Sequence, residues 1–201
     1  MDERSTEIEA KFAVADLEPT RRCLLDLAAR LARPRLRETN LRFDDDADRL
    51  RRAGHVLRLR QNHETRLTFK APGRDAEHRQ EIEFGVDEPR AARRFLEALG
   101  YRVVFVYEKY RETFALDAVD VMLDELPFGA FVEIEGPAIA AVRAAADRLG
   151  LPWEARLATT YLGLFERLRS AHGWSFRDAT FDNFRHLPRP PLDEVLQAAS
   201  R

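Results

Sequence analysis

The segment Glu7-Ile8-Glu9-Ala10-Lys11-Phe12, close to the N-terminus, decides how the rest of the chain is interpreted. Successive side chains of an extended strand point to opposite faces, so the three charged residues share one face and the three apolar residues share the other. An ordinary amphipathic strand that shows its charged face to water has this pattern. A strand that offers two carboxylates to a divalent cation and an ammonium to an anion has it too. The segment alone leaves both interpretations open.

The same spacing of charges returns along the chain. Glu-Ile-Glu occurs again at Glu81–Glu83 and at Glu133–Glu135, each time in a strand-like segment that leads into a helix-like one. Basic residues two apart occur as Arg58 with Arg60 and as Lys109 with Arg111. Solvated sheet faces usually mix charges with Thr, Ser, Asn and Gln, whereas nearly every strand-like segment here carries two charges. This regularity favours an enclosed charged face.

The composition excludes several classes of protein. In 201 residues, 34% are charged but the net charge is only -2, so the chain has no basic field that would recruit nucleic acid non-specifically. The single cysteine, Cys23, excludes an internal disulfide and fits a reducing compartment. No apolar run approaches the roughly 20 residues of a membrane span. We therefore expect a soluble cytoplasmic protein, monomeric or homodimeric, that binds neither membranes nor nucleic acid.

Hydrophobic periodicity predicts about eight strands, which lie at Ser5–Val14, Leu36–Asp44, His55–Gln61, Thr65–Ala71, His78–Val86, Tyr101–Leu116, Val119–Leu126 and Gly129–Gly136. Helices are expected from Asp16 to Pro34, from Asp87 to Leu99, from Pro137 to Leu149 and from Ala158 to Arg169, with a short one at the C-terminus. Several connections have the length of hairpins, which favours an antiparallel sheet and an α+β fold. The acidic turn that begins at Asp44-Asp45-Asp46 is typical of a solvated loop, with a metal site as the alternative.

Two parts of the chain are distinguished. Residues 1–169 carry the repeated charge pairs and form the main domain. Residues 170–201 form an extension in which Trp174, Phe176, Phe181 and Phe184 predict docking onto that domain.

A closed sheet explains the charge pairs best. The positions opposite the charges are often large and apolar, for example Ile8, Phe12, Leu59, Phe69, Ile82, Tyr110 and Ile134, and helices are available to cover them. We predict a closed eight-stranded antiparallel barrel with helices outside, wide enough inside for one small ligand. An interior lined with Lys and Arg would bind a compact polyanion. Carboxylates beside it would hold Mg²⁺ or Mn²⁺, which prefer oxygen ligands and commonly bind phosphate.

At this point the sequence resembles a known family. The charged motifs resemble, in order and spacing, those of the CYTH family, also called triphosphate tunnel metalloenzymes: Glu7-x-Glu9-x-Lys11, Arg58-x-Arg60, Lys70, Glu81-x-Glu83, Lys109-x-Arg111, Asp124 and Glu133-x-Glu135. The resemblance covers about residues 5–168 and implies a barrel tunnel that acts on triphosphates. Family members include thiamine triphosphatases, tripolyphosphatases, RNA triphosphatases and class IV adenylyl cyclases.

The resemblance also implies roles for individual residues. The implied metal ligands are Glu7, Glu9, Glu133 and Glu135, with Glu81, Glu83 and Asp124 at the same end or at a second metal position. The implied phosphate contacts are Lys11, Arg58, Arg60, Lys70, Lys109 and Arg111. Among these two sets, Glu9, Lys11, Arg60 and Lys70 are the candidate catalytic residues. One stretch departs from the family pattern: some members place a tyrosine just before the Asp-containing turn after the second strand, where this chain has Leu41-Arg42-Phe43-Asp44, so a tyrosine-assisted mechanism is not expected. Arg42 is left open between a phosphate contact and a surface role.

The leading hypothesis is a metal-dependent hydrolase of inorganic tripolyphosphate or of a small organic triphosphate such as thiamine triphosphate or a nucleoside triphosphate. The alternative is a class IV adenylyl cyclase, in which the ribose 3′-hydroxyl attacks the α-phosphate of ATP and pyrophosphate leaves. A non-catalytic polyphosphate receptor would have no use for so many paired glutamates. A structural β protein with solvated charged faces would not need the regular pairing.

Overall fold

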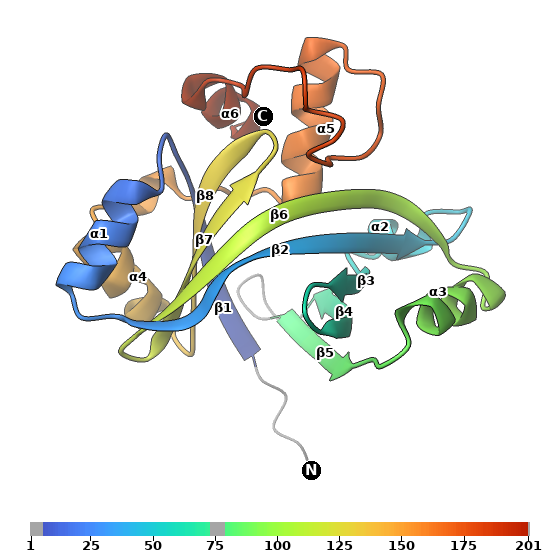
Figure 1. The fold of residues 1–201 in the computed structure, drawn as a ribbon, viewed down its shortest axis with the longest axis horizontal. Helices are drawn as coiled ribbons and strands as arrows, with labels where there is room; N and C mark the ends of the chain where they lie inside the picture. Colours follow the sequence, from blue (N-terminus) through green and yellow to red (C-terminus); the bar gives the residue numbers. More distant parts are fainter. Residues whose placement is uncertain (1–5, 73–78, 201) are drawn as a thin grey trace. The chain divides into compact units, whose positions relative to one another are not determined.

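The structure, a computed structural model, describes residues 6–72 and 79–200, and of Thr6, Glu7 and Arg79 only the backbone (Figure 1). It divides into two compact units. Unit 1 is Glu38–Glu108 together with the chain up to Glu7, and unit 2 is Ile8–Arg37 together with Lys109–Arg201. Ser5 and His78, with which two of the predicted strands begin, lie outside the described residues.

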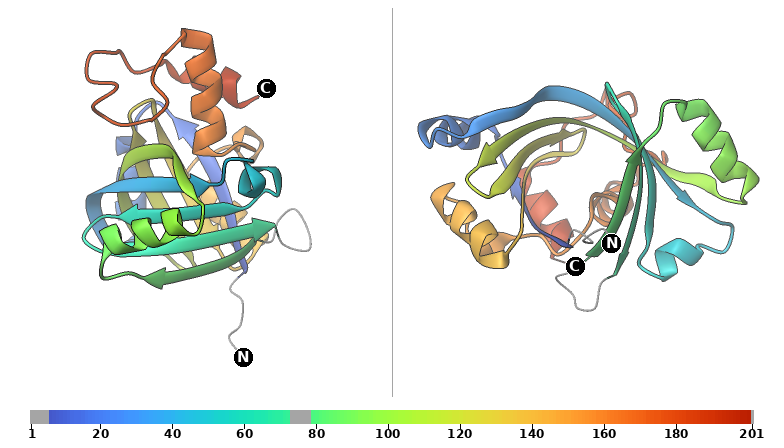
Figure 2. Two further views of the ribbon diagram at one scale, coloured as in Figure 1. Left: turned by 90° about the vertical axis from the view of Figure 1, so that its right-hand side faces the viewer. Right: turned by 90° about the horizontal axis from the view of Figure 1, so that it is seen from below.

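Unit 1 is an antiparallel sheet with a helix on its apolar face. Strands β3 (Val56–Gln61), β4 (Thr65–Pro72) and β5 (Arg79–Gly85) pair in sequence order. One side of this meander pairs with β2 (Arg30–Asp44) and the other with the first residues of β1 (Thr6–Val14). Leu96 on helix α3 (Pro89–Ala98) packs against Phe43, Leu57 and Leu59. The ribbon of α3 can be followed in Figure 2.

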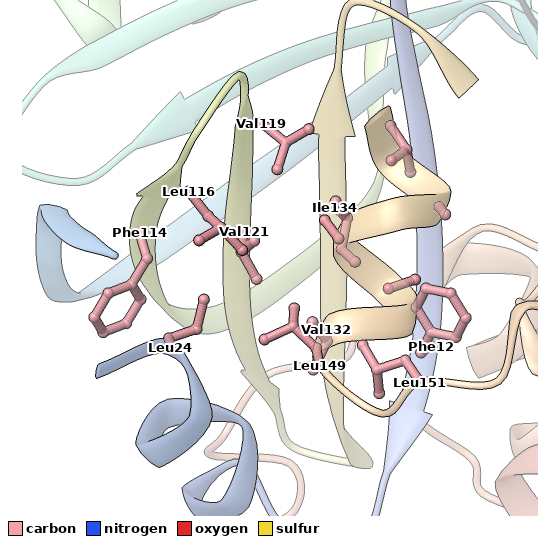
Figure 3. Packing of buried hydrophobic residues seen from close by; sticks show 14 of the residues in the cluster. Phe12, Leu24, Phe114, Leu116, Val119, Val121, Val132, Ile134, Leu149 and Leu151 are labelled. Carbon is pink, nitrogen blue, oxygen red and sulfur yellow. The ribbon is translucent and has the colours of Figure 1, made fainter. Parts of the chain in front are cut away.

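Unit 2 holds the larger apolar core. From Lys109 onward, β6 (Arg102–Leu116) belongs to this unit and forms an antiparallel meander with β7 (Val119–Leu126) and β8 (Gly129–Gly136). Strand β8 also pairs with β1 from Ile8 to Val14. Helices α1 (Glu18–Asp26) and α4 (Ile139–Arg148) cover its apolar face. Figure 3 shows the side chains between these elements, among them Phe12, Leu24, Val121, Val132 and Ile134.

Three further elements complete unit 2. The short 3₁₀ helix η1 (Trp153–Ala155) leads to helix α5 (Tyr161–His172), and helix α6 (Leu192–Ala199) packs beside α5. The ring of Phe165 on α5 lies 6.3 Å from that of Trp174 and 6.4 Å from that of Phe184. Aromatic residues of the C-terminal segment thus pack on α5.

The described part of the chain contains eight strands, and every strand pairing given above is antiparallel. The α+β class and the antiparallel sheet are therefore as predicted, while closure of the strands into a barrel stays a prediction. None of the helices in the described residues combines the length and apolar composition that crossing a bilayer requires.

The predicted first helix is wrong at its C-terminal end. It was expected to continue to Pro34, but α1 ends at Asp26 and β2 begins at Arg30. The amide of Ala29 donates to Leu24 O and the amide of Ala28 donates to Leu25 O, both at 2.9 Å, which is the hydrogen-bond pattern of a Schellman motif. The motif places Ala28 in the left-handed region, at φ 55°, where glycine is the usual residue. Without a glycine, the sequence carried no stop signal there.

Two further expectations are corrected. Ile82 on β5 is 51% exposed, so no helix covers this position in unit 1. The acidic turn is only partly a solvated loop, because Asp46 is exposed but Asp44 and Asp45 are buried, and its carboxylates are not arranged as a metal site. It contains the short helix α2 (Arg49–Arg52), and the buried carboxylate of Asp44 accepts hydrogen bonds from the amides of Leu50 and Arg51, both at 2.9 Å. This carboxylate satisfies amides at the start of α2 that have no helical partner.

Candidate functional site

The charged face of unit 2 is set by strand register. Lys11 lies directly opposite Glu133 on the β1–β8 pair, and on the β6–β7 pair Arg111 lies directly opposite Asp124. Residues opposite each other on neighbouring strands share a face of the sheet. The alternate residues, such as Ile134, point into the core under α1 and α4. Burial of the apolar face thus fixes the charged side chains on the other one.

Six side chains on this face form what we call the Asp124 cluster: Lys11, Lys109, Arg111, Asp124, Glu133 and Tyr161. Asp124 is fully buried and accepts from Lys109 Nζ at 2.9 Å and from Arg111 Nε and Nη2 at 2.6 and 2.5 Å. Glu133 pairs with Lys11 at 3.0 Å and also accepts from Arg111. Three cations therefore share two carboxylates, which leaves one positive charge in the cluster.

Tyr161 supports this cluster from helix α5. Its hydroxyl donates to Asp124 Oδ2 at 2.8 Å, and Lys11 Nζ lies 4.2 Å from the centroid of its ring. Lys109 Nζ lies 5.5 Å from the same centroid. A cation over an aromatic face is attracted by the ring quadrupole, and more strongly in a desolvated place such as this one. Tyr161 thus contacts an anion and two cations of the cluster.

The charges of the cluster shift the pKa values of its members. Burial alone would lower the pKa of the Lys11 ammonium, but the negative charges of Glu133 and Glu9 outweigh it, and this pKa is raised. Burial alone would raise the pKa of Glu133, but Lys11, Arg111 and Lys109 hold it well below its ordinary range. Burial, with Asp124 and Glu133, raises the pKa of Tyr161 well above its ordinary value. At neutral pH the pair of Lys11 and Glu133 is therefore charged and the phenol of Tyr161 is neutral.

Unit 1 carries a second group, the Glu83 cluster, which consists of Arg58, Arg60, Thr68, Glu83 and Tyr107. Glu83 accepts from Arg60 Nη2 at 3.1 Å and from the hydroxyl of Thr68 at 2.7 Å. Arg58 donates to Thr68 at 3.4 Å and to the Tyr107 hydroxyl at 3.5 Å. Burial would lower the pKa of Arg58, but Tyr107, Glu83 and Glu38 raise it. Next to this cluster in register, Lys70 pairs with Glu81 at 2.6 Å.

Two carboxylates on the charged face of unit 2 suit a divalent cation. Among the described side chains, no three carboxylate, imidazole or thiol groups gather as metal ligands. Glu9 and Glu135 do lie directly opposite each other on β1 and β8, and like charges so placed repel unless a cation lies close by. Carboxylate pairs are the ligands that Mg²⁺ and Mn²⁺ prefer. The chemistry of Glu9 and Glu135 fits such an ion; the side chain of Glu7, another predicted ligand, lies outside the described residues.

The predicted site residues fall into two groups by location. Unit 2 brings together Lys11, Lys109, Arg111, Asp124 and Glu133, and places Glu9 and Glu135 on the adjoining register position of the same face. Unit 1 brings together Arg58, Arg60 and Glu83, with Lys70 and Glu81 beside them. In both units the carboxylates that were predicted to bind metal contact cations that were predicted to bind phosphate. Those roles stay predictions.

Sequence reasoning missed Tyr161 and Tyr107. Tyr161 was assigned to the apolar side of a packing helix, and Tyr107 to an ordinary β-branched and aromatic strand. Only the fold shows that their hydroxyls contact Asp124 and Arg58. A tyrosine within an apolar stripe is a weak signal, because its ring packs like that of phenylalanine and its hydroxyl can find a partner anywhere nearby.

Similarity to known proteins is consistent with this arrangement. A Vibrio parahaemolyticus protein, provisionally assigned as an adenylate cyclase, superimposes with a TM-score of 0.72 at 20% identity, over 79% of this chain and 97% of that one. A Pyrococcus horikoshii protein superimposes with a TM-score of 0.67 at 25% identity, over 77% and 96% of the two chains. A Hippeastrum protein superimposes with a TM-score of 0.58 at 18% identity, over 83% of this chain and 95% of that one. That protein is provisionally assigned as an adenylyl cyclase and is described as having a dominant triphosphatase activity.

No curated protein matches the chain in sequence. The likenesses below 25% identity establish the fold alone. A family model, however, matches residues 5–148, a span that contains all of the predicted metal-binding and phosphate-binding residues. Tyr161 lies beyond the matched residues. On the strength of this match, the chain belongs to the CYTH domain family.

Proposed function

We propose that this protein is a metal-dependent hydrolase of inorganic tripolyphosphate or of a small organic triphosphate. Members of its family act on triphosphates, by hydrolysis or cyclisation. The observation that carries the proposal is the Asp124 cluster, in which Lys11, Lys109 and Arg111 converge on two carboxylates. Phosphate oxygens are acceptors of the same kind as those carboxylates, so a triphosphate can compete for the same N–H donors.

The residues of the cluster would bind and orient the substrate. Arg111 donates through Nε and Nη2 in a fork that suits two phosphate oxygens as well as it suits Asp124. The raised pKa of Lys11 keeps its ammonium charged where negative charge develops. Positioning and charge neutralisation supply most of the catalysis in phosphoryl transfer, and a water attacks the terminal phosphorus in line with the leaving group. Glu9 and Glu135 would hold a Mg²⁺ or Mn²⁺ ion, which would supply positive charge against the phosphates.

The cations of unit 1 belong to the same proposal. Arg58, Arg60 and Lys70 are predicted to hold phosphate oxygens, and each contacts a carboxylate, as the cations of unit 2 do. We also propose that the eight strands close into a barrel, because family membership and the antiparallel pairings support the barrel predicted from the sequence. Slow amide exchange along both edges of β2 and β6 would support closure, and rapid exchange along one edge of either strand would refute it.

Product analysis tests the proposed reaction. Pure protein is incubated with tripolyphosphate, thiamine triphosphate and ATP, each with Mg²⁺ or Mn²⁺, and orthophosphate, pyrophosphate and cyclic AMP are followed. We expect orthophosphate from at least one substrate and no cyclic AMP. Cyclic AMP with pyrophosphate as the dominant products of ATP would replace hydrolysis by the cyclase alternative. No turnover of any triphosphate would refute both reactions.

A further inference from the structure

Asn40 on β2 is the least satisfied buried polar side chain among the described residues of unit 1. It is fully buried, yet within the described part of the chain neither its Nδ2 nor its Oδ1 has a hydrogen-bond partner. Buried side-chain amides are nearly always hydrogen-bonded, because an unpaired buried donor or acceptor loses its water without compensation. The described contacts of unit 1 give this amide no partner, so they do not account for a polar side chain at this buried position.

Strand register places Asn40 beside the Glu83 cluster. Asn40 lies directly opposite Arg60 on the β2–β3 pair, and such pairs have their Cβ atoms about 5 Å apart. Arg60 Nε is itself buried with no hydrogen-bond partner among the described residues, as is Arg58 Nε on the same face. An unpaired acceptor, Asn40 Oδ1, therefore faces a strand that carries unpaired guanidinium donors.

The present contacts of Arg60 explain why the pair is not made. Its Nη2 donates to Glu83 at 3.1 Å, so the guanidinium is directed toward β5, away from β2. A phosphate that replaced Glu83 as the partner of Arg60 would release the guanidinium from this direction. A guanidinium has five N–H donors in a fixed plane, so an acceptor on Nε sets the orientation of the whole fork.

We propose that Asn40 is a positioning residue for Arg60: when a triphosphate draws Arg60 away from Glu83, Asn40 Oδ1 accepts the Nε–H and aims the guanidinium at the phosphate. This inference rests on the proposed function, because it assigns Arg60 a phosphate. It explains the unpaired amide as a group that finds its partner only in the complex. The ligand class is a compact polyanion with at least one terminal phosphate.

The test compares tripolyphosphate binding with stability in the full-length chain. Asn40→Leu removes both polar groups and keeps the branching of the side chain, although leucine is larger, and Asn40→Ala is a second variant in case leucine does not fit. The dissociation constant of inorganic tripolyphosphate is measured by calorimetry, and the melting temperature is measured without ligand. Asn183→Leu is the matched control, because the Asn183 amide is already hydrogen-bonded, to Asp178 O at 2.7 Å.

For Asn40→Leu we expect about tenfold weaker binding with an unchanged or higher melting temperature, since a hydrogen bond to a charged group is lost only in the complex. For Asn183→Leu we expect a lower melting temperature and unchanged affinity. In an Arg60→Met background, Asn40→Leu should weaken binding no further, because Asn40 acts through Arg60.

Three results would overturn the inference. Affinity within twofold of wild type in both Asn40 variants would mean that an ordered water satisfies the amide or that it has no role in binding. A full additional loss in the Arg60→Met background would mean that Asn40 does not act through Arg60. Wild-type protein that binds no tripolyphosphate, and turns over no triphosphate, would refute the proposed function and this inference together.

Discussion

Replacing Tyr161 by phenylalanine should cost the fold a buried hydrogen bond while leaving the aromatic ring in place. The Tyr161 hydroxyl donates to the fully buried carboxylate of Asp124 at 2.8 Å, and the variant removes this donor. A hydrogen bond to a charged group contributes about 1.5–3 kcal/mol. For a domain of this size about 1 kcal/mol corresponds to roughly 2–4 °C, so the melting temperature should fall by about 3–12 °C.

Tyr161→Leu separates the ring from the hydroxyl. It also removes the aromatic face beneath Lys11 Nζ, at 4.2 Å, and should cost roughly a further 0.5–2 kcal/mol. Tyr110→Phe is the control, because the described contacts of Tyr110 with Phe181 and Arg35 are made by its ring. Thermal and urea unfolding of the three variants would be compared with wild type. Tyr161→Phe within 1 °C of wild type, or Tyr161→Leu no less stable than Tyr161→Phe, would refute the role given to Tyr161.

Three further predictions concern other parts of the molecule. The folded-state pKa of Glu133 is lowered, so its stabilisation is complete above the ordinary value of 4.5 and is lost as the pH falls through the lower one. The difference in unfolding free energy between wild type and Glu133→Gln should therefore shrink below about pH 4.5, and a difference that did not depend on pH would contradict the pairing with Lys11 and Arg111. The Glu9→Gln variant should lose most of its triphosphate turnover but still bind tripolyphosphate, which calorimetry would measure. Unchanged turnover would contradict the assignment of Glu9 as a metal ligand. Phe184 is 6% exposed and its ring contacts those of Phe165 and Trp174, so Phe184→Ala should lower the free energy of unfolding by about 3–5 kcal/mol. Leu187 is 37% exposed, and Leu187→Ala should lower it far less. Equal losses of unfolding free energy in urea would contradict the docking of the C-terminal segment on α5.

Strands bounded by clear turns were predictable from the sequence. Strands β7 and β8 have the predicted bounds, because the two strand-like segments Val119–Leu126 and Gly129–Gly136 are separated by only two turn residues. The β3–β4 hairpin was predicted correctly for the same reason. The end of α1 was not, because the left-handed residue there is Ala28, and an alanine carries no stop signal.

The candidate site was predictable as a set of charges but not as a set of contacts. Alternation placed Lys11 and Glu133 on the charged faces of their strands, and register then made them partners. Hydrophobic periodicity does not predict which strands become neighbours in the sheet or how a helix packs against it. The contact of Tyr161 with Asp124 and the burial of Asn40 depend on those tertiary relations, so a single sequence could not reveal them.

The most direct test of the central claim is the rate of orthophosphate release from tripolyphosphate, with Mg²⁺ or Mn²⁺, by wild type and Arg111→Met. Arg111 contacts both carboxylates of the Asp124 cluster, whereas Arg21 pairs with Glu112 at 2.8 Å, outside the cluster, and provides the control. Removing one charged donor from a phosphoryl-transfer site typically costs about 10²–10³ in rate. We predict a loss of about 100-fold or more in kcat/KM for Arg111→Met, with Arg21→Met within about threefold of wild type. A folded Arg111→Met protein that hydrolyses tripolyphosphate as fast as the Arg21→Met control would contradict the claim that the Asp124 cluster binds and activates a triphosphate.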